Sequence, residues 1–244
     1  MDAISTSAAA GMRSRMESLE MLANNLANVE TGGFKADREF YSVYTGEDAT
    51  FDPQTGDASV LPVIESQWID HSQGNFRNTS NPLDFAIDGV GLFAVQTPAG
   101  VRYTRNGNFR ISPAGTLITN DGNRVIAQGG GPIQLQPGIP VEVTPDGTVN
   151  QQGQPVGQLQ LSAFDLPSLN KAGLNYFVPL DGTQPKPATG VVLQGKLEQS
   201  NVGAAESAVR LVAIMRQFEK LQKAMNIGNE LNRRAIEEVA RVAA

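Results

Sequence analysis

The chain contains no cysteine and a single histidine, His71, among its 244 residues. Without cysteine there are no disulfides, thiolate zinc sites, iron–sulfur clusters or cysteine nucleophiles. One histidine excludes a multi-histidine metal site within one chain. Basic charge is also scarce, because 19 Lys and Arg stand against 25 Asp and Glu, for a net charge of −6. That balance argues against a nucleic-acid-binding protein. We expect no metal and no cofactor.

Long hydrophobic runs are missing as well. The longest apolar stretches are a few residues, far below the roughly 18 that a membrane-spanning helix needs. The first ten residues lack a basic segment and a continuous apolar core, so they do not resemble a cleaved secretory signal. We expect no membrane insertion.

Residues that break helices are scarce at both ends of the chain. All 14 Pro lie between Pro53 and Pro187. Only three of the 25 Gly lie in residues 1–30 or 196–244, namely Gly11, Gly203 and Gly228. Since Pro and Gly interrupt helices, this distribution separates two helical ends from a middle of different structure.

The N-terminal end is predicted to be an amphipathic helix that stops at Thr31-Gly32-Gly33, where glycine can adopt the left-handed C-cap conformation. Phe34 follows at a position that often packs against such a cap. The apolar residues recur at spacings of three, four and seven, which is an a/d-type pattern. They are Ile4, Ala8, Met12, Leu19, Leu22, Leu26 and Val29.

The C-terminal end predicts a longer helix, from about residue 202 to 242. Ser200 or Asn201 can cap it, and Glu206 suits the positive end of the helix dipole. Gly228-Asn229 is a predicted bend or early stop. The predicted apolar face consists of Leu211, Ile214, Met215, Phe218, Leu221 and Met225.

The middle of the chain predicts β-structure with tight turns, because short β-branched and aromatic runs alternate with turn dipeptides. The predicted strands are Leu92–Gln96, Val101–Thr104, Thr116–Thr119, Arg124–Ala127, Val141–Val143 and Gln158–Leu161. The predicted turns are Asn106-Gly107, Asp121-Gly122, Pro137-Gly138, Asp146-Gly147 and Asp181-Gly182. Thr45 to Ser59 predicts a loop or linker.

The predicted fold class is α+β, with the two terminal helices pairing as a coiled-coil-like α domain around a central mainly-β domain. The predicted parts are an N-terminal helix at 1–34, an extended spacer at 35–68, a β-rich domain at 69–195 and a C-terminal helix at 196–244. A helix with one narrow apolar stripe is marginal alone. Two interpretations stay open: a helical lid on one β domain, or a subunit that completes its core on assembly.

Three asparagines, Asn24, Asn25 and Asn28, lie within about one helical turn. Asparagine is a poor helix former because its amide competes for backbone groups. The group indicates either specific hydrogen bonds that set the register of a packed helix interface, or fraying before Gly32-Gly33.

Asp84 and Asp88 flank a short apolar run and could form a glycosidase acid–base pair, but neighbouring Asn-Pro and Gly residues favour turn chemistry. His71, in Asp70-His71-Ser72, is interpreted as a surface-loop residue, because no Gly-x-Ser-x-Gly motif accompanies it. Gly129-Gly130-Gly131 lacks the Lys-Ser/Thr and the helix of a phosphate-binding loop, so it predicts a turn.

Three stretches of the chain carry the motifs of a known family. Residues 23–35, ANNLANVETGGFK, resemble the N-terminal signature of flagellar basal-body rod and hook proteins. Residues 81–93, NPLDFAIDGVGLF, with YTRNGNF at 103–109, resemble its β-domain motif. Ser200-Asn201-Val202, Glu206 and the following helix resemble its C-terminal segment. The three stretches span almost the whole chain in the family's order.

The resemblance implies a non-enzymatic structural subunit of the bacterial flagellar rod, with copies of itself and neighbouring rod proteins as partners. It implies that the terminal helices pack into the inner tube of the rod, which crosses the periplasm and transmits torque. It also implies delivery by the flagellar export apparatus without signal cleavage. The expected assembly interface comprises Leu19, Leu22, Asn24, Asn25, Leu26, Asn28, Phe34, Ser200, Asn201, Val202, Leu211, Ile214, Phe218 and Leu221.

The short spacer between Phe34 and Trp68 and the modest length are most similar to the proximal-rod type, with the distal-rod type as the alternative. An alternative of a different class is a periplasmic glycan-acting enzyme that uses Asp84 and Asp88. A non-flagellar self-assembling surface protein with helical ends is a third possibility.

Overall fold

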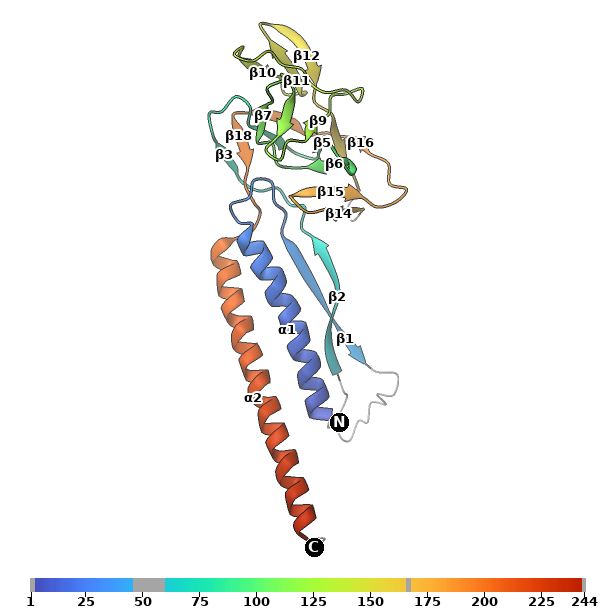
Figure 1. The fold of residues 1–244 in the computed structure, drawn as a ribbon, viewed down its shortest axis with the longest axis vertical. Coiled ribbons are helices and arrows are strands. Elements are labelled where there is room, and N and C mark those ends of the chain that lie inside the picture. Colours follow the sequence, from blue (N-terminus) through green and yellow to red (C-terminus); the bar gives the residue numbers. More distant parts are fainter. Residues whose placement is uncertain (1–2, 46–59, 166–167, 243–244) are drawn as a thin grey trace. The chain divides into compact units, whose positions relative to one another are not determined.

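The computed structural model describes residues 3–45, 60–165 and 168–242. These residues form a helix, a series of β-strands and a second helix (Figure 1), so the predicted α+β class is confirmed. The chain divides into two compact units. The helical unit comprises Met1–Ala27, Asp37–Asp70 and Gly203–Ala244, and the β unit comprises Asn28–Ala36 and His71–Val202.

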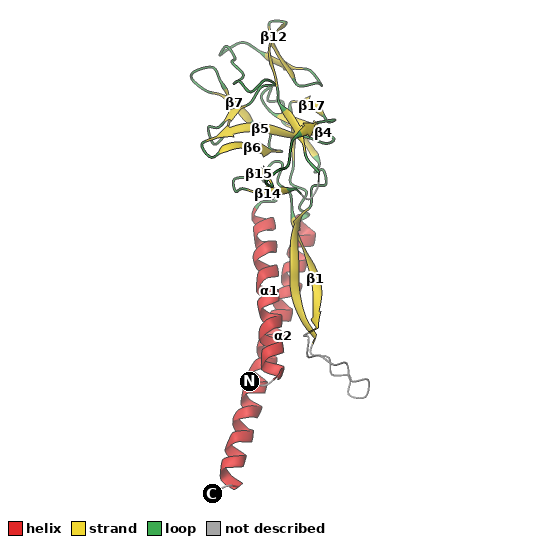
Figure 2. Ribbon diagram, turned by 90° about the vertical axis from the view of Figure 1, so that its right-hand side faces the viewer, coloured by secondary structure: helices red, strands yellow, loops and turns green. Residues whose placement is uncertain are grey.

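The helical unit contains two helices and one pair of strands within its described part. Helix α1 (Ala3–Ala27) and helix α2 (Ala204–Val242) lie side by side, and α2 continues past the start of α1 (Figures 1 and 2). Strands β1 (Asp37–Thr45) and β2 (Val60–Ile69) pair antiparallel beside α1. The predicted extended spacer is therefore largely a strand pair. The predicted loop at 45–59 lies outside the described residues except for Thr45, which ends β1.

Each helix differs from its prediction at one point, α1 at its C-terminal end and α2 at Gly228. Helix α1 ends at Ala27, several residues before the predicted stop at Thr31-Gly32-Gly33. The reason is that residues 28–36 belong to the β unit, where Phe34 is buried. Helix α2 runs without a break through Gly228, so the predicted early stop is wrong. A single glycine costs a helix only about 1 kcal/mol, which the length of α2 accommodates.

The β unit contains several small sheets around one core. Its largest sheet follows the order β14-β15-β6-β5-β9-β8-β7, with β13 pairing both β5 and β16. Strands β10, β11 and β12 form a second sheet, and β17–β4 and β18–β3 are antiparallel pairs. The strand bounds are β3 Phe76–Asn78, β4 Phe85–Asp88, β5 Leu92–Thr97, β6 Gly100–Thr104, β7 Phe109–Ile111, β8 Leu117–Thr119, β9 Arg124–Val125, β10 Val141–Val143, β11 Thr148–Gln151, β12 Gln154–Gln158, β13 Leu161–Ala163, β14 Leu169–Lys171, β15 Tyr176–Pro179, β16 Lys186–Pro187, β17 Val191–Gln194 and β18 Lys196–Glu198.

The core of the β unit gathers apolar side chains from all along its sequence. Phe109 packs against Phe85 and Phe93, with ring centroids 5.8 and 5.2 Å away. The other buried members are Ile87, Leu117, Val125, Ile133, Leu135, Val141, Val149, Leu159 and Val192. Val192 and Ile87 come from the ends of the unit's sequence and meet through the β17–β4 pair. The core is thus closed only when the last strands are in place.

Most predicted strands are confirmed, but the one at Gln158–Leu161 is wrong. Gln158 ends β12 and Leu161 begins β13. The intervening backbone changes partner at each residue, since Leu159 N–H donates to Gly147 and Gln160 N–H donates to Ile126. Alternation of apolar and polar residues cannot distinguish such a crossing from a regular strand.

The glycine of the predicted Asn106-Gly107 turn has a different role. Gly107 lacks the positive φ of a tight hairpin turn, whereas Gly122 and Gly147 have it at 86° and 85°. A Cβ atom on Gly107 would lie 1.7 Å from the carbonyl oxygen of Phe85. This glycine is required by the close approach of two backbone segments.

The pKa values of two tyrosines predict how the stability of the β unit changes at alkaline pH. Burial raises the pKa of Tyr176 and of Tyr103 above the ordinary 10.0. The unfolded chain then loses the phenolic proton at a lower pH than the folded chain. The free energy of unfolding therefore contains the whole contribution of these pKa shifts below roughly pH 10, and it loses that contribution as the pH rises through the folded-state pKa. Urea unfolding between roughly pH 8 and 11 should show this loss, and each Tyr→Phe variant should reduce it.

The two variants should differ at neutral pH. Tyr176 Oη donates to Thr119 or Asp121 at 3.1 and 2.9 Å, and Asn123 donates to it at 3.2 Å. Tyr176→Phe should therefore cost about 1 kcal/mol at neutral pH, and Tyr103→Phe less. An unchanged alkaline slope in both variants would contradict the assignment.

Candidate functional site

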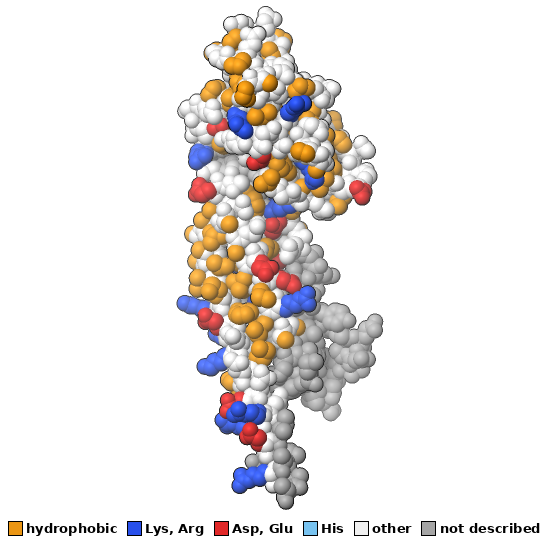
Figure 3. All heavy atoms as spheres, in the orientation of Figure 1, with side chains coloured by type: hydrophobic (Ala, Val, Ile, Leu, Met, Phe, Trp, Pro, Cys, Tyr) orange, Lys and Arg blue, Asp and Glu red, His pale blue; other side chains and the backbone are white. Residues whose placement is uncertain are grey.

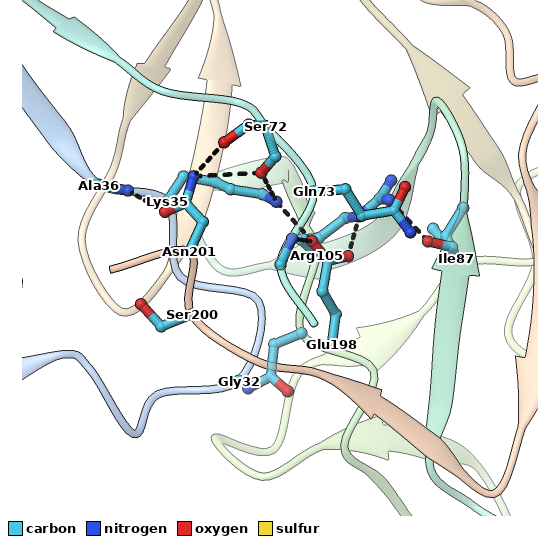
Figure 4. A network of polar contacts seen from close by, with 12 residues as sticks. Gly32, Lys35, Ala36, Ser72, Gln73, Ile87, Arg105, Glu198, Ser200 and Asn201 are labelled. Carbon is cyan, nitrogen blue, oxygen red and sulfur yellow. Dashed lines mark hydrogen bonds and ion pairs between the residues drawn. The ribbon is translucent and has the colours of Figure 1, made fainter. Parts of the chain in front are cut away.

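A buried carboxylate, Glu198, lies at the centre of the polar network of the β unit (Figure 4). Its Oε1 accepts from Lys35 Nζ at 2.5 Å and from the Gly74 N–H at 3.0 Å. Its Oε2 accepts from Arg105 Nε at 2.5 Å. We call Lys35, Arg105 and Glu198 the Glu198 cluster. All three side chains are at most 6% exposed, so the cluster is shielded from solvent.

The two cations of the cluster also donate to backbone carbonyls. Lys35 Nζ donates to the Ser72 oxygen at 2.7 Å. Arg105 donates through Nη1 to Gly91, and through Nη2 to Ile87 at 2.7 Å and Gly89 at 2.8 Å. These bonds hold the turn after β4 and fix the orientation of the guanidinium. Burial of charge is tolerated only with such complete hydrogen bonding.

The cluster joins chain segments that lie far apart in the sequence. The Gly33 N–H donates to the Glu198 carbonyl at 2.7 Å, and Asn201 N–H donates to Phe34 at 3.3 Å. Asn201 Oδ1 accepts from the Ala36 N–H at 2.7 Å. Gly33 has a φ of +68°, and a Cβ there would lie 2.5 Å from the Arg105 carbonyl carbon. The segment after α1 is thereby held against the segment before α2.

This arrangement locates several predicted interface residues inside the β unit. Phe34 is buried, with Lys171 Nζ 4.2 Å from its ring centroid. Ser200, Asn201 and Val202 are half-buried in the same unit. Asn28 accepts from the Thr31 hydroxyl. Sequence reasoning missed Glu198, Lys35 and Arg105 as a cluster; a signal was available, since Lys35 and Arg105 both lie in the quoted motifs.

Small and polar residues predominate among the buried positions described on α1. Within residues 9–27, the buried positions are Gly11, Ser14, Ser18, Met21, Leu22 and Asn25. A Cβ on Gly11 would lie 3.4 Å from a methyl group of Leu221, which shows how closely the helices approach there. Of the stripe predicted for α1, Leu22 is buried and Met12, Leu19 and Leu26 are half-buried.

Helix α2 turns most of its predicted apolar face toward α1, but leaves other large apolar side chains exposed. Ile214 is buried, and Leu211, Phe218, Leu221 and Met225 are half-buried. Figure 3 shows hydrophobic side chains over the surface of the helices. The exposed ones are Met16 of α1 and Val209, Val212, Met215, Ile227 and Leu231 of α2. Val209 is 71% exposed, and Val209, Val212 and Met215 share one face because they lie three residues apart.

The three asparagines serve different roles. Asn25 is buried, and its amide bonds both backbone groups of Asp37: Nδ2 donates to the carbonyl at 2.8 Å and Oδ1 accepts from the N–H at 2.9 Å. Asn25 thus fixes the start of β1 to α1 within one chain. Asn24 is exposed on α1.

Asp84 and Asp88 contact different side chains. Asp84 is 3% exposed and accepts from the Asn81 side chain at 3.0 Å, which matches the turn chemistry expected for Asn81-Pro82. Asp88 is exposed and accepts from Gln73. His71 contacts the Phe177 ring, with centroids 5.6 Å apart. Among the residues that the structure describes, no group of three His, Asp or Glu side chains could hold a metal ion.

Two protein-family models match separate stretches of the chain. A model described as the flagellar hook protein FlgE/F/G D1 domain matches residues 86–154. A model described as the flagellar basal body rod FlgEFG protein C-terminal region matches residues 193–238. These matches define the class of protein as a flagellar axial protein, of the hook or the rod.

Individual relatives narrow the class from hook or rod proteins to rod proteins. FlgF, a flagellar basal-body rod protein of Caulobacter vibrioides, is 36% identical over 228 residues, covering 92% of this chain and 92% of the relative. FlgG, a rod protein of Buchnera aphidicola from Schizaphis graminum, is 32% identical, covering 91% and 94%. FlgG of Bacillus subtilis is 30% identical, covering 91% and 93%. The chain belongs to the flagellar basal-body rod protein family, whose members are structural proteins.

None of the helices described here combines the length and the hydrophobicity that crossing a bilayer requires.

Replacing Glu198 by glutamine should strongly destabilise the chain. The change leaves two buried cations without their carboxylate, and removal of one partner from a buried ion pair costs about 3–5 kcal/mol. The control is Asp165→Asn, which breaks the exposed Lys186–Asp165 pair and should cost below about 1 kcal/mol. Urea unfolding measures both, and similar losses in the two variants would refute the role given to Glu198.

Asn25→Ala should destabilise the helical unit, because it leaves the backbone N–H and carbonyl of Asp37 without these partners. Unsatisfied buried polar groups cost about 1–3 kcal/mol each. The matched control, Asn24→Ala, changes an exposed side chain on the same turn and should shift stability by about 0.5 kcal/mol or less. Amide exchange of the Asp37 N–H should accelerate only in Asn25→Ala.

Proposed function

We propose that this chain is a structural subunit of the bacterial flagellar basal-body rod, and that it self-assembles through α1 and α2. The observation that carries the proposal is the exposed apolar face of α2, together with family membership. Val209, Val212 and Met215 are each at least 48% exposed. Burial of each such side chain between subunits would contribute roughly 1.5–3 kcal/mol before entropy is subtracted.

The helix pair is proposed to act as a coiled-coil-like unit within the rod. The residues of α2 on the α1 side recur at alternating spacings of three and four, from Leu211 through Ile214, Phe218, Leu221 and Met225 to Gly228. That alternation is the heptad spacing of a helical seam. One face of α2 thus serves its own chain, and the opposite face is available to neighbours.

The proposed partners are further copies of this chain and adjoining rod proteins, in the periplasm-spanning part of the basal body. Delivery by the flagellar export apparatus, without a cleaved signal, is part of the proposal. The proposed interface keeps Leu19, Leu26 and Asn24 on α1, and extends the expected set by Val209, Val212 and Met215 on α2.

The proximal-rod type is the member we propose. Support comes from the identity of 36% to FlgF of Caulobacter vibrioides, against 30–32% for FlgG of Bacillus subtilis and Buchnera aphidicola. The distal-rod type is the alternative. Electron microscopy of basal bodies from a deletion strain tests both, because a proximal subunit should be required for every later part of the rod. Intact rods in that strain would overturn the function itself.

The absence of cysteine makes a direct test of the interface possible. Val212→Cys introduces a single thiol on the exposed apolar face of α2, so any disulfide must join two subunits. We expect oxidised basal bodies to contain disulfide-linked copies of the chain for Val212→Cys, because that face is buried between copies.

The matched control is Gln217→Cys, which places a thiol on an exposed polar position of the same helix, away from that face. It should give little linked product. Equal linkage at both positions, or none at Val212→Cys in assembled basal bodies, would contradict the proposed interface.

A further inference from the structure

The hairpin that joins β14 to β15 holds a leucine in an unusual backbone conformation. The Tyr176 N–H donates to the Gly173 carbonyl at 2.9 Å and closes a tight turn. The two central residues, Leu174 and Asn175, have φ of 48° and 62°. Positive φ at both central positions is characteristic of a type I′ turn, which favours asparagine, aspartate or glycine there. Leucine at such a position is strained, because its Cβ crowds the following carbonyl oxygen.

The strain at Leu174 is not offset by burial of its side chain. Leu174 is 77% exposed, and no other large apolar side chain among the described residues is more exposed. Asn175 fixes the turn, since its Nδ2 donates to the Gly32 carbonyl at 2.7 Å and its carbonyl accepts from the Thr104 hydroxyl at 2.9 Å. The turn is therefore a firm support that presents an apolar side chain to the surroundings. Backbone strain of this kind is typical of functional positions.

A cavity of about 270 Å³ lies within the same β unit. Its apolar lining consists of Val90, Leu92, Ala163, Phe164 and Leu169. Val90 is exposed and lies at the mouth. Lys35 and Arg105 also line the cavity, but they already donate to Glu198 and to backbone carbonyls of the β unit. The cavity therefore favours an apolar occupant, and its volume is several times the roughly 30 Å³ of a water molecule, so a leucine side chain fits.

We propose that Leu174 of one copy of the chain inserts into this cavity of a second copy. Leu174 is not part of the cavity lining in its own chain, so the contact joins two different surfaces of two copies. Such a contact is head-to-tail, and it can repeat along a helical assembly. The inference rests on the proposed function, because it needs copies that assemble in a rod.

The charges near the two surfaces are complementary. The β14–β15 hairpin, residues 169–179, contains one charged side chain, Lys171. Asp88, at the end of β4, is exposed and lies two residues before Val90 at the mouth of the cavity. A positive hairpin therefore meets a negative rim, which favours the proposed orientation over one that brings like charges together.

The size of the contact determines where it has an effect. Burial of one leucine side chain changes an equilibrium constant by roughly tenfold to a hundredfold, which is far less than a stable dimer needs. The purified chain should therefore remain monomeric. In a rod the helices already hold copies together, so a weak second contact acts at high effective concentration.

The first experiment replaces Leu174 by asparagine, which a type I′ turn favours. Leu174→Asn should raise the melting temperature of the purified chain by roughly 2–4 °C, because the turn is relieved of strain. When it is co-expressed with an equal amount of the original chain, the variant should enter basal bodies roughly tenfold less often. Mass spectrometry of purified basal bodies measures that ratio.

The matched control is Leu180→Asn. Leu180 is also an exposed leucine of the β unit, at 45%, but its φ is not positive. This variant should neither raise the melting temperature nor enter basal bodies less often. Equal incorporation of Leu174→Asn and the original chain, or a lower melting temperature of Leu174→Asn, would overturn the proposal.

A disulfide experiment identifies the surface that receives Leu174. One strain co-expresses Leu174→Cys and Val90→Cys on separate copies, and a second strain co-expresses Leu174→Cys and Val101→Cys. Val101 is an exposed valine of β6 that does not line the cavity. After oxidation of the basal bodies, we expect a peptide that joins position 174 to position 90, and little or none that joins 174 to 101. Reduced incorporation of Leu174→Asn without the 174–90 peptide would mean that another surface receives Leu174, and would overturn the proposal.

The result can be separated from that of the proposed function. A chain that is present in basal bodies and links through Val212→Cys, but gives no 174–90 peptide, refutes this contact alone. A chain that is absent from basal bodies refutes both.

Discussion

The buried carboxylate of Glu198 is the constraint on which the organisation of this chain depends. It ends β18, immediately before the segment that leads into α2, and it binds Lys35 in the segment that follows α1. Arg105, between them in sequence, binds the second oxygen. A carboxylate without solvent needs both cations and the Gly74 N–H, because each unsatisfied lone pair would carry a desolvation cost. The three segments must therefore be in place together, and residues 28–36 fold as part of the β unit although they follow the N-terminal helix directly.

A second constraint follows from the residues that line the helix seam. Gly11 allows α1 to approach α2 closely, in the way that small residues permit close contact between helices. Ser14 and Ser18 are also buried on α1, and such small side chains bury little apolar surface. On α2, Ile214 is buried and Phe218 is half-buried, whereas Val212 and Met215 are exposed. The intramolecular helix pair therefore leaves part of the apolar surface of α2 uncovered.

The sequence was sufficient to predict the helix–β–helix order, because proline and glycine are confined to the middle and the apolar spacing of α2 is regular. It was also sufficient to predict that Leu22 and Ile214 lie on the apolar faces of their helices, where both are buried. The tight turns at Asp121-Gly122 and Asp146-Gly147 were predictable as well. The early end of α1 was not predictable, because Gly33 is used for contact with Arg105 and not as a helix cap. The prediction of a hairpin turn at Gly107 was wrong for the same reason, because this residue lacks a side chain to let the Phe85 backbone approach. The roles of Gly33 and Gly107 depend on backbone segments that are remote in sequence, and so do the ion pairs of Glu198. No local sequence pattern encodes such contacts.

The pairing of two cations with one carboxylate follows from the same geometry. Holding a remote chain segment with a lysine places a second cation on a carboxylate that Arg105 already binds. A glutamine at position 35 would join the segments through neutral and weaker hydrogen bonds. A lysine gives the stronger connection. The ion pair that joins residues 28–36 to the β unit therefore also connects the two segments that lead to the helices, because Glu198 lies just before α2 and Lys35 follows α1.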